Sequence, residues 1–140
     1  MVIVQCKDTR IVGVQSTKQS VSECKKGQGN MNGKLKNIEK STKLEMKELV
    51  QYADGQIVSK TLVQNRAVSL TLFAFEKGEE ISTHESGGDA LVTVLEGVGR
   101  FTIDGEPFIL KEGESIVMPA KTPHAVYGEE RFKMLLNVVF

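Results

Sequence analysis

Short apolar runs separated by turn residues occupy the chain after residue 55. The runs are rich in Val, Leu, Ile, Thr and Phe, whereas the breaks between them contain Gly, Asp or Asn. Asp104-Gly105 is the clearest break, because this pair is typical of a two-residue β-hairpin turn. A succession of short strands without helical patterns between them predicts an all-β sandwich or barrel. The predicted strands cover residues 57–63, 67–75, 90–95, 100–103, 108–110, 115–118, 125–127 and 132–140.

The segment just before these strands has a helical pattern. Leu44, Met46, Leu49 and Val50 recur at near-helical spacing between residues 42 and 52. This spacing predicts one short N-terminal helix, with a Ser or Thr at its start and an Asp-Gly pair after its end.

The first part of the chain offers little to bury. Residues 15–42 consist mainly of Ser, Thr, Lys, Gln, Gly and Asn. So few apolar side chains cannot offset an ordering cost of about 1–2 kcal/mol per residue. We therefore predict a disordered polar and basic extension over residues 1–43, followed by one β-barrel domain over residues 44–140. The extension is either an arm for nucleic acid or an acidic partner, or a solvated tail, and its dilute charge favours the tail.

Charge is balanced over the whole chain but not along it. The 140 residues include 18 basic and 18 acidic side chains, with a pI near 6.7. Residues 1–48 carry ten basic and five acidic side chains, whereas residues 49–140 carry eight and thirteen. This balance argues against a nucleic-acid-coating protein or a polybasic membrane protein. The longest apolar run, residues 67–75, is far shorter than the ~20 residues of a membrane-spanning helix. We expect neither a nucleic-acid nor a membrane partner.

Cysteine content favours a cytoplasmic location. The two cysteines, Cys6 and Cys24, are too few for a disulfide-dense secreted scaffold and form no Cys-x-x-Cys motif. The apolar stretch at the start is interrupted by charges and is too short for a signal peptide.

The two histidines of the chain, His84 and His124, both lie in the strand-rich part. Forty positions separate them, so they form no local ligand pair. Either histidine alone is more often a hydrogen-bonded side chain than a metal ligand.

Two segments around these histidines resemble the conserved motifs of the cupin superfamily. Residues 78–97, with Gly78, His84 and Gly97 at the expected spacings, are similar to the first cupin motif, Gly-x5-His-x-His-x3–4-Glu-x6-Gly. Residues 113–128 are similar to the second, Gly-x5-Pro-x-Gly-x2-His-x3-Asn. The resemblance covers about residues 55–140 and is closest to small single-domain bacterial cupins. It implies an RmlC-like jelly-roll β-barrel that forms a homodimer, and the apolar segments 134–140 and 57–63 offer edge strands that need cover.

The motifs depart from the family at the metal-binding positions. Family metal sites take two His and one Glu from the first motif and one His from the second, and these positions here are His84, Ser86, Ala90 and His124. A divalent transition metal would therefore have an incomplete ligand set of His84 and His124. Strand alternation turns the neighbouring carboxylates, Glu85 and Asp89, to the opposite face.

The predicted barrel mouth still offers a polar pocket. We expect His84, Ser86, Lys121 and His124 to orient a carboxylate, phosphate or hydroxyl group of a small polar molecule. A second hypothesis is a metal-dependent enzyme, an oxygenase or isomerase, in which water or substrate completes the ligand set. A third is a structural or partner-binding barrel without a working site.

Overall fold

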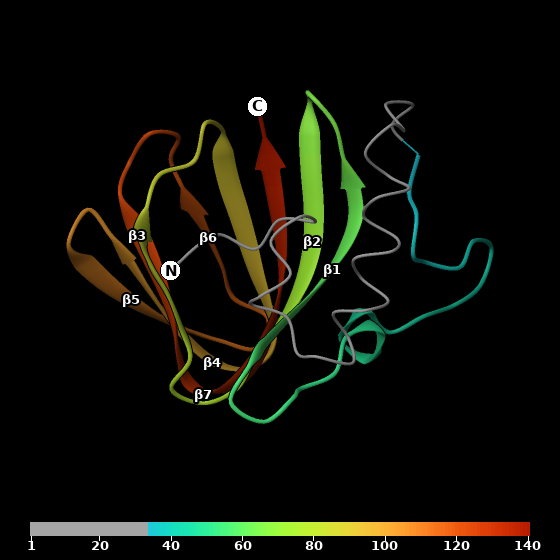
Figure 1. Ribbon diagram of the computed structural model, residues 1–140, viewed down its shortest axis with the longest axis horizontal. Helices are drawn as coiled ribbons and strands as arrows, with labels where there is room; N and C mark the ends of the chain where they lie inside the picture. Colours follow the sequence, from blue (N-terminus) through green and yellow to red (C-terminus); the bar gives the residue numbers. More distant parts are fainter. Residues whose placement is uncertain (1–33) are drawn as a thin grey trace.

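Two long antiparallel strands, β4 (Asp89–Ile103) and β7 (His124–Val139), form the centre of the molecule (Figure 1). Their register runs from Asp89 opposite Val139 to Ile103 opposite His124, so they pair along almost their whole lengths. The computed structural model describes residues 34–140 of the chain. Its shorter strands are β1 (Ile57–Gln64), β2 (Val68–Phe75), β3 (Glu80–His84), β5 (Glu106–Lys111) and β6 (Ser115–Met118).

All seven strands are hydrogen-bonded into one continuous array, which the two long strands divide into two sheets that share them. The half of β7 after residue 132 pairs with β2, and the facing half of β4 pairs with β6, which gives the order β1-β2-β7-β4-β6. The other halves pair with β3 and β5, which gives the order β3-β7-β4-β5. Figure 1 shows the two sheets converging at the bottom and diverging toward the top. This two-sheet jelly roll confirms the predicted all-β fold.

Aromatic side chains fill the space where the sheets converge. Phe73, Phe75, Phe101 and Phe132 are fully buried. The ring of Phe132 stacks on Phe75 with centroids 4.7 Å apart, and it meets Phe101 edge-on at 5.9 Å. Each such pair contributes about 0.5–1.5 kcal/mol beyond the area that it buries. The two sheets are therefore joined by a specific aromatic contact as well as by shared strands.

Two glycines that the sequence pattern predicts as strand breaks lie inside strands. A Cβ atom on Gly97 of β4 would overlap the carbonyl oxygen of Arg131. One on Gly128 of β7 would lie 2.8 Å from the carbonyl oxygen of Glu76. These glycines permit close approach of neighbouring backbones, so the four strands predicted in these regions merge into two.

The turn between β4 and β5 is the predicted hairpin turn. Asp104 and Gly105 have φ angles of 51° and 85°, the positive values that this turn requires at both central positions. The pattern does not predict β3, because Ile81 is the one buried apolar residue among its five.

The predicted short helix is a single 3-10 turn, η1 (Met46–Leu49). The residues on both sides are extended, and no side chain caps its start, so an α-helix does not form. Met46 and Leu49 pack against the core, and Lys133 Nζ donates a hydrogen bond to the Lys47 carbonyl oxygen at 2.6 Å. The near-helical spacing therefore reflects apolar residues that reach the sheet from an irregular segment.

The extension predicted for residues 1–43 lies largely outside the described residues, which begin at 34. Residues 34–43 form an irregular segment that contacts β1 and has no regular secondary structure. The Lys36 N–H donates to the Leu62 carbonyl oxygen at 2.7 Å, and Ile38 packs against the core. In the part of the chain that the structure describes, no helix has the length and apolar character to cross a membrane.

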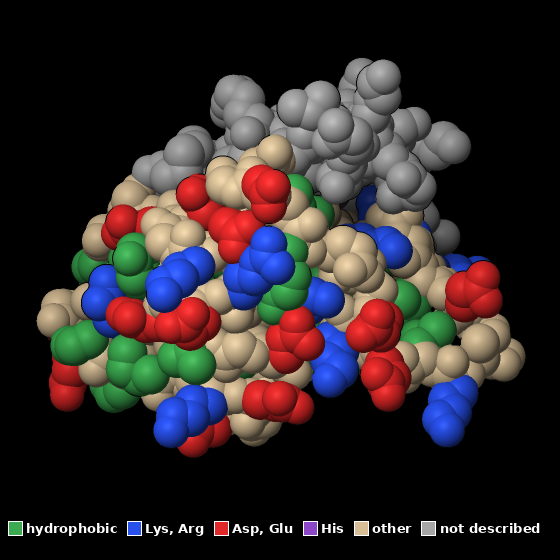
Figure 2. Space-filling view, turned by 90° about the horizontal axis from the view of Figure 1, so that it is seen from below, with side chains coloured by type: hydrophobic (Ala, Val, Ile, Leu, Met, Phe, Trp, Pro, Cys, Tyr) green, Lys and Arg blue, Asp and Glu red, His purple; other side chains and the backbone are tan. Residues whose placement is uncertain are grey.

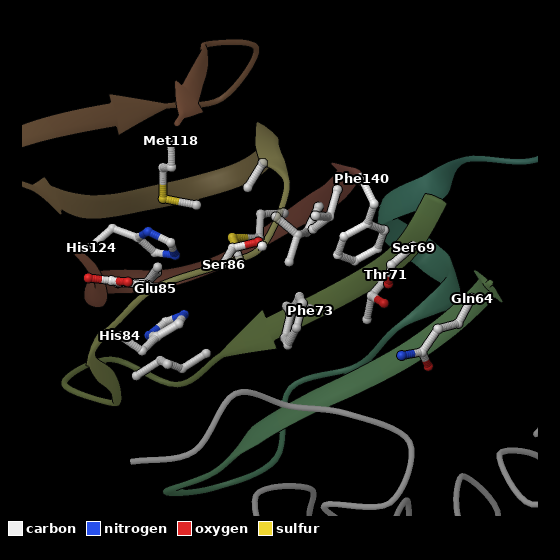
Figure 3. Close-up of a pocket in the computed structure, with 17 residues that line it drawn as sticks. Gln64, Ser69, Thr71, Phe73, His84, Glu85, Ser86, Met118, His124 and Phe140 are labelled. Atoms are coloured by element: carbon white, nitrogen blue, oxygen red, sulfur yellow. The ribbon is translucent and has the colours of Figure 1, made fainter. Parts of the chain in front are cut away.

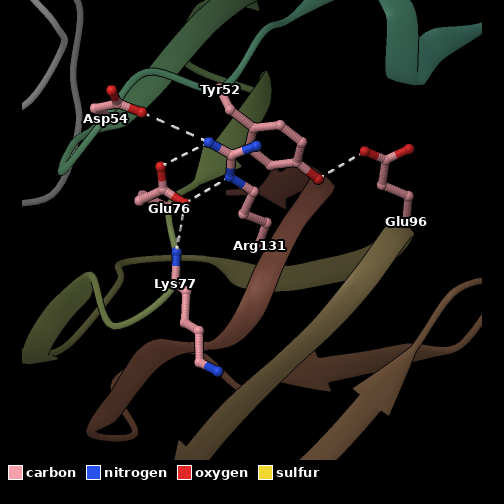
Figure 4. Close-up of polar contacts among 6 residues, drawn as sticks. All are labelled: Tyr52, Asp54, Glu76, Lys77, Glu96 and Arg131. Atoms are coloured by element: carbon pink, nitrogen blue, oxygen red, sulfur yellow. Dashed lines mark hydrogen bonds and ion pairs between the residues drawn. The ribbon is translucent and has the colours of Figure 1, made fainter.

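A polar cluster fastens the segment after η1 to the lower end of the sheets (Figure 4). The Tyr52 hydroxyl donates to Glu96 Oε2 at 2.6 Å, and the Arg131 guanidinium lies 5.0 Å from the centre of the Tyr52 ring. Arg131 donates to both carboxylate oxygens of Glu76, at 2.6 and 3.0 Å, and its Nη2 lies 3.6 Å from Asp54. Burial raises the pKa of Tyr52, and the hydrogen bond to Glu96 raises it further. The cluster therefore holds a neutral phenol between charged neighbours.

Acidic and basic side chains are interspersed over the lower face of the molecule (Figure 2). Surface ion pairs of this mixed kind join Lys77 to Glu130 at 3.4 Å and Arg100 to Glu129 at 2.8 Å. A face of mixed sign differs from the clustered basic surface that nucleic-acid binding uses.

Candidate ligand-binding site

A cavity of about 270 Å³ lies between the diverging ends of the sheets. Its volume is just below the usual range of small-molecule pockets, about 300–1,000 Å³. Strand alternation supplies most of its wall, because every second residue of β2, β4 and β7 faces inward. Apolar side chains dominate that wall, among them Phe73, Ile81, Met118, Val126, Met134 and Leu136.

Polar side chains gather at the two ends of the cavity (Figure 3). His84, Glu85 and His124 lie at one end, and Figure 3 shows Phe73 between them and the opposite end. The opposite end is formed by Gln64, Ser69 and Thr71. The cavity therefore suits a molecule with an apolar middle and at least one polar terminus.

The two histidines are direct cross-strand neighbours. His84 ends β3, His124 begins β7, and the two residues are opposite each other in the register of this antiparallel pair. Their ring centroids are 4.4 Å apart with an interplanar angle of 68°. Side chains directly opposite on one face of a sheet are close enough to interact. The pairing thus brings together two residues that are forty positions apart in the sequence, and both line the cavity.

The hydrogen bonds of the rings fix which nitrogen carries a proton. His84 Nδ1 lies 2.7 Å from the Ser82 carbonyl oxygen, and His124 Nδ1 lies 2.9 Å from the Thr122 carbonyl oxygen. Because a carbonyl oxygen only accepts hydrogen bonds, each Nδ1 must be the donor, and Nε2 of the neutral ring is then an acceptor. Burial lowers the pKa of His84, and the nearby His124 lowers it further, against the effect of the Ser82 hydrogen bond. The His84 ring is therefore neutral at neutral pH.

The other predicted site residues divide into two groups. Ser86 and Ala90 line the cavity together with the histidines. The Ser86 hydroxyl accepts a hydrogen bond from the Gly88 N–H at 3.2 Å. The Lys121 side chain is exposed and is not among the lining residues; the Lys121 backbone N–H instead donates to the Ser86 carbonyl oxygen at 2.8 Å.

Glu85 borders the cavity at its mouth, but its side chain is exposed. It follows His84, the last residue of β3, and lies in the loop after that strand. The expectation for Asp89 agrees with the structure: its carboxylate accepts a hydrogen bond from the Ala120 N–H at 2.8 Å and is not part of the cavity wall. Neither carboxylate residue is therefore buried inside the cavity.

A catalytic metal ion does not fit the side chains at this end. Among residues 34–140, no group of three or more His, Cys, Asp or Glu side chains is placed to hold a metal ion. Catalytic zinc sites use three protein ligands, whereas a serine and an alanine occupy two of the four family positions here. The polar side chains at this end therefore act through hydrogen bonds.

Comparison with known proteins places the chain among small β-barrel proteins. The family described as "Cupin domain" matches residues 71–139. A conserved protein of unknown function from Streptococcus pyogenes is 44% identical, with a TM-score of 0.75 over 79% of this chain and 96% of that chain. A cupin superfamily protein from Desulfitobacterium hafniense is 33% identical, with a TM-score of 0.73 over 76% of this chain and 98% of that chain.

Two further matches are weaker evidence, because one has low sequence identity and the other covers a short segment. A salicylate 1,2-dioxygenase variant from Pseudoaminobacter salicylatoxidans is 20% identical, with a TM-score of 0.56 over 59% of this chain and 26% of that chain, and this likeness shows the fold alone. Among curated proteins, an uncharacterised protein from Methanocaldococcus jannaschii is 48% identical over 33 residues. That match spans 24% of this chain and about a quarter, 26%, of the relative.

Proposed function

The chain belongs to the cupin superfamily, and we propose that it binds a small organic molecule in the cavity between its sheets. Cupin folds carry unrelated chemistries, so the proposal stands on the pocket and not on the fold. The observation that carries it is the fixed tautomer of two adjacent rings, which presents Nε2 of His84 and Nε2 of His124 as acceptors. A ligand group that donates hydrogen bonds is the complement of this arrangement.

The rest of the cavity suits an apolar body. Phe73, Met118 and Met134 contribute aromatic and thioether surface, and thioethers adapt to irregular shapes. A small aromatic or branched aliphatic group fills a cavity of about 270 Å³. The sequence-based expectation of a small polar molecule is thereby narrowed to a molecule with one donor-bearing head and an apolar remainder.

The alternative functions receive less support. The metal-dependent oxygenase or isomerase requires ligands that Ser86 and Ala90 do not provide. An inert structural barrel would not need this cavity. Both histidines line it, and neither uses Nε2 for a hydrogen bond within residues 34–140.

Methionine methyl groups provide the test. Met118 and Met134 line the cavity, whereas Met46 lies outside it in η1. We expect benzyl alcohol, added to protein labelled at its methionine methyl groups, to shift the NMR signals of Met118 and Met134 and to leave that of Met46 unchanged. His84→Phe removes one acceptor at similar size, so it weakens binding of benzyl alcohol but not of toluene. Failure of both compounds to shift the cavity methyl signals would contradict the proposed function.

A further inference from the structure

The histidine end of the cavity offers two hydrogen-bond acceptors of the same kind. The Nδ1 atoms of His84 and His124 donate to backbone carbonyl oxygens at 2.7 and 2.9 Å, so Nε2 of each neutral ring is an acceptor. The two rings lie opposite each other across the β3–β7 pair, with centroids 4.4 Å apart. His124 is buried and His84 is half-buried. Two acceptors on rings this close can be reached by one small head group.

A hydroxyl donor belongs to the same part of the wall. Ser86 follows His84 by two residues, and its hydroxyl accepts a hydrogen bond from the Gly88 N–H at 3.2 Å. The Lys121 N–H donates to the Ser86 carbonyl oxygen at 2.8 Å, which ties Ser86 to the segment that leads into His124. Figure 3 shows Ser86 between the histidines and the opposite end of the cavity. Because Gly88 uses the Ser86 hydroxyl only as an acceptor, the hydroxyl hydrogen is available to a ligand.

The cavity holds no buried charge that could accompany these groups. Among its lining residues, Glu85 is the one formally charged side chain, and it is exposed at the mouth. The Lys121 side chain is exposed and lies outside the cavity wall. An ammonium or a carboxylate would lose hydration on entering without meeting an opposite charge inside, and burial of an unpaired charge is costly. A neutral head group is therefore favoured.

Two acceptors require two donors on that head group. An alcohol has one O–H donor and would leave one Nε2 atom without a partner, and an unpaired acceptor in an enclosed site lowers affinity. A primary amide has two N–H donors on a single nitrogen atom, together with a carbonyl oxygen that accepts hydrogen bonds. Its donors match the two Nε2 atoms, and its carbonyl oxygen matches the Ser86 hydroxyl.

We infer that the ligand is a small neutral primary amide, with its two N–H donors directed at Nε2 of His84 and Nε2 of His124. The carbonyl oxygen accepts from the Ser86 hydroxyl, and the apolar body lies along Phe73. This inference rests on the proposed function and specifies the head group. Among neutral ligands that share one body, affinity should therefore follow the number of donors on the head group.

A matched series with one aromatic body provides the test, using the full-length protein and the methyl signals of Met118 and Met134. The compounds are benzamide, acetophenone, benzyl alcohol, benzylamine and benzoate, compared at about pH 8, which is above the ordinary histidine pKa. Acetophenone keeps the carbonyl group and the size of benzamide but has a methyl group in place of the amino group. We expect benzamide to bind about tenfold more tightly than acetophenone, with benzyl alcohol between them and both charged compounds weaker than benzamide.

The series separates failure of the inference from failure of the proposed function. Equal affinity for benzamide and acetophenone, or tighter binding of benzylamine or benzoate than of benzamide, would overturn the inference. Binding of benzyl alcohol in that case would leave the proposed function in place. No shift of either methyl signal with any of the five compounds would overturn both.

Two variants assign the individual contacts. His84→Phe removes one acceptor at similar size, so the preference for benzamide over acetophenone should fall several-fold. Ser86→Ala removes a donor that serves both carbonyl compounds, so both should bind several-fold more weakly while the preference stays the same. Ser115→Ala is the matched control, because it removes an exposed hydroxyl outside the cavity and should change neither affinity. An unchanged preference in His84→Phe, or equal effects of Ser86→Ala and Ser115→Ala, would overturn the corresponding contact.

Discussion

Gly97 of β4 packs directly against the backbone of Arg131 in β7, so closely that a side chain at residue 97 would overlap the Arg131 carbonyl oxygen. Gly97 also has a φ of +82°, in the left-handed region that L side chains rarely adopt. The contact lies next to the register irregularities of the two long strands, where they pass from one sheet to the other. A side chain at residue 97 is therefore incompatible with this close backbone approach.

Replacing this glycine should destabilise the protein strongly. We expect Gly97→Ala to lower the free energy of unfolding by about 2–5 kcal/mol, because steric overlap adds to the backbone strain. Gly105→Ala is the matched control, since Gly105 has a similar φ of +85° but open space around it. It should lose only about 1–2 kcal/mol. Urea denaturation measures both values, and equal losses would show that the approach to Arg131 is not important.

The ion pair between Arg131 and Glu76 predicts a loss of stability in acid. The hydrogen bond from Arg131 lowers the pKa of Glu76 below its usual value of 4.5. A carboxylate with a lowered pKa in the folded state contributes stability above the unfolded-state pKa, and this contribution disappears as the pH falls through the folded-state pKa. Glu76→Gln should therefore unfold at a lower temperature than the parent at neutral pH and at the same temperature well below pH 4.5.

A second carboxylate provides the control for this pH dependence. Glu130 pairs with Lys77 at 3.4 Å, but both side chains are more than half exposed. Exposed pairs of this kind contribute little. Glu130→Gln should therefore leave the unfolding temperature nearly unchanged at every pH, and an effect as large as that of Glu76→Gln would contradict the importance of the Arg131 contact.

Restoring two family ligands should create a metal site. The side chains at 84, 86, 90 and 124 all line the same cavity. Ser86→His combined with Ala90→Glu would therefore place three histidines and one glutamate around one point. We expect tight binding of Mn, Fe, Ni or Zn by the double variant and weak or no binding by the parent, measured by titration calorimetry. Tight binding by the parent would show that the present ligand set suffices. A folded double variant without affinity would show that the four positions do not converge.

The expected homodimer can be tested at a defined surface. The segment 134–140, predicted as an edge strand, belongs mostly to β7, which lies between β2 and β4 and is not an edge. The candidate dimer surface is instead the outer sheet face, where Leu91 and Val117 are neighbouring exposed residues. A second copy of the chain would cover this apolar face. Light scattering should give about twice the chain mass of 15.4 kDa, and Leu91→Glu should halve it. Ile109→Glu changes a somewhat more exposed residue of the other sheet and should leave the dimer intact. A parent mass near 15.4 kDa would reject the dimer.

The cytoplasmic location stays a separate prediction, which the mass measurement does not test.

The sequence was most informative where side-chain alternation is local. Alternation along β2 and β7 is visible in the residue pattern, and the inward-facing residues of these two strands line the cavity. Prediction from the residue pattern failed where backbone contacts between distant segments decide whether a strand continues. The pattern around Gly97 resembles a turn, and only its contact with Arg131 shows that the strand continues.

Two charged side chains near the cavity were harder to place from the sequence. Glu85 lies at the cavity mouth, one residue after the end of β3, with an exposed side chain. Lys121 has a positive φ of 60°, is exposed and does not line the cavity. Both depend on where a short element begins or ends, which is the least certain feature of a sequence pattern.

The sharing of β4 and β7 between both sheets has a consequence for synthesis on the ribosome. β7 is the last strand in chain order, yet it inserts between β2 and β4 and supplies a neighbour to β3 as well. Until it emerges, the β1–β2 and β4–β5 hairpins have formed local pairs, but β2 and β4 still present open strand edges that invite pairing with other chains. We therefore expect the nascent chain to be most prone to misassembly before β7 is available to pair with β2 and β4.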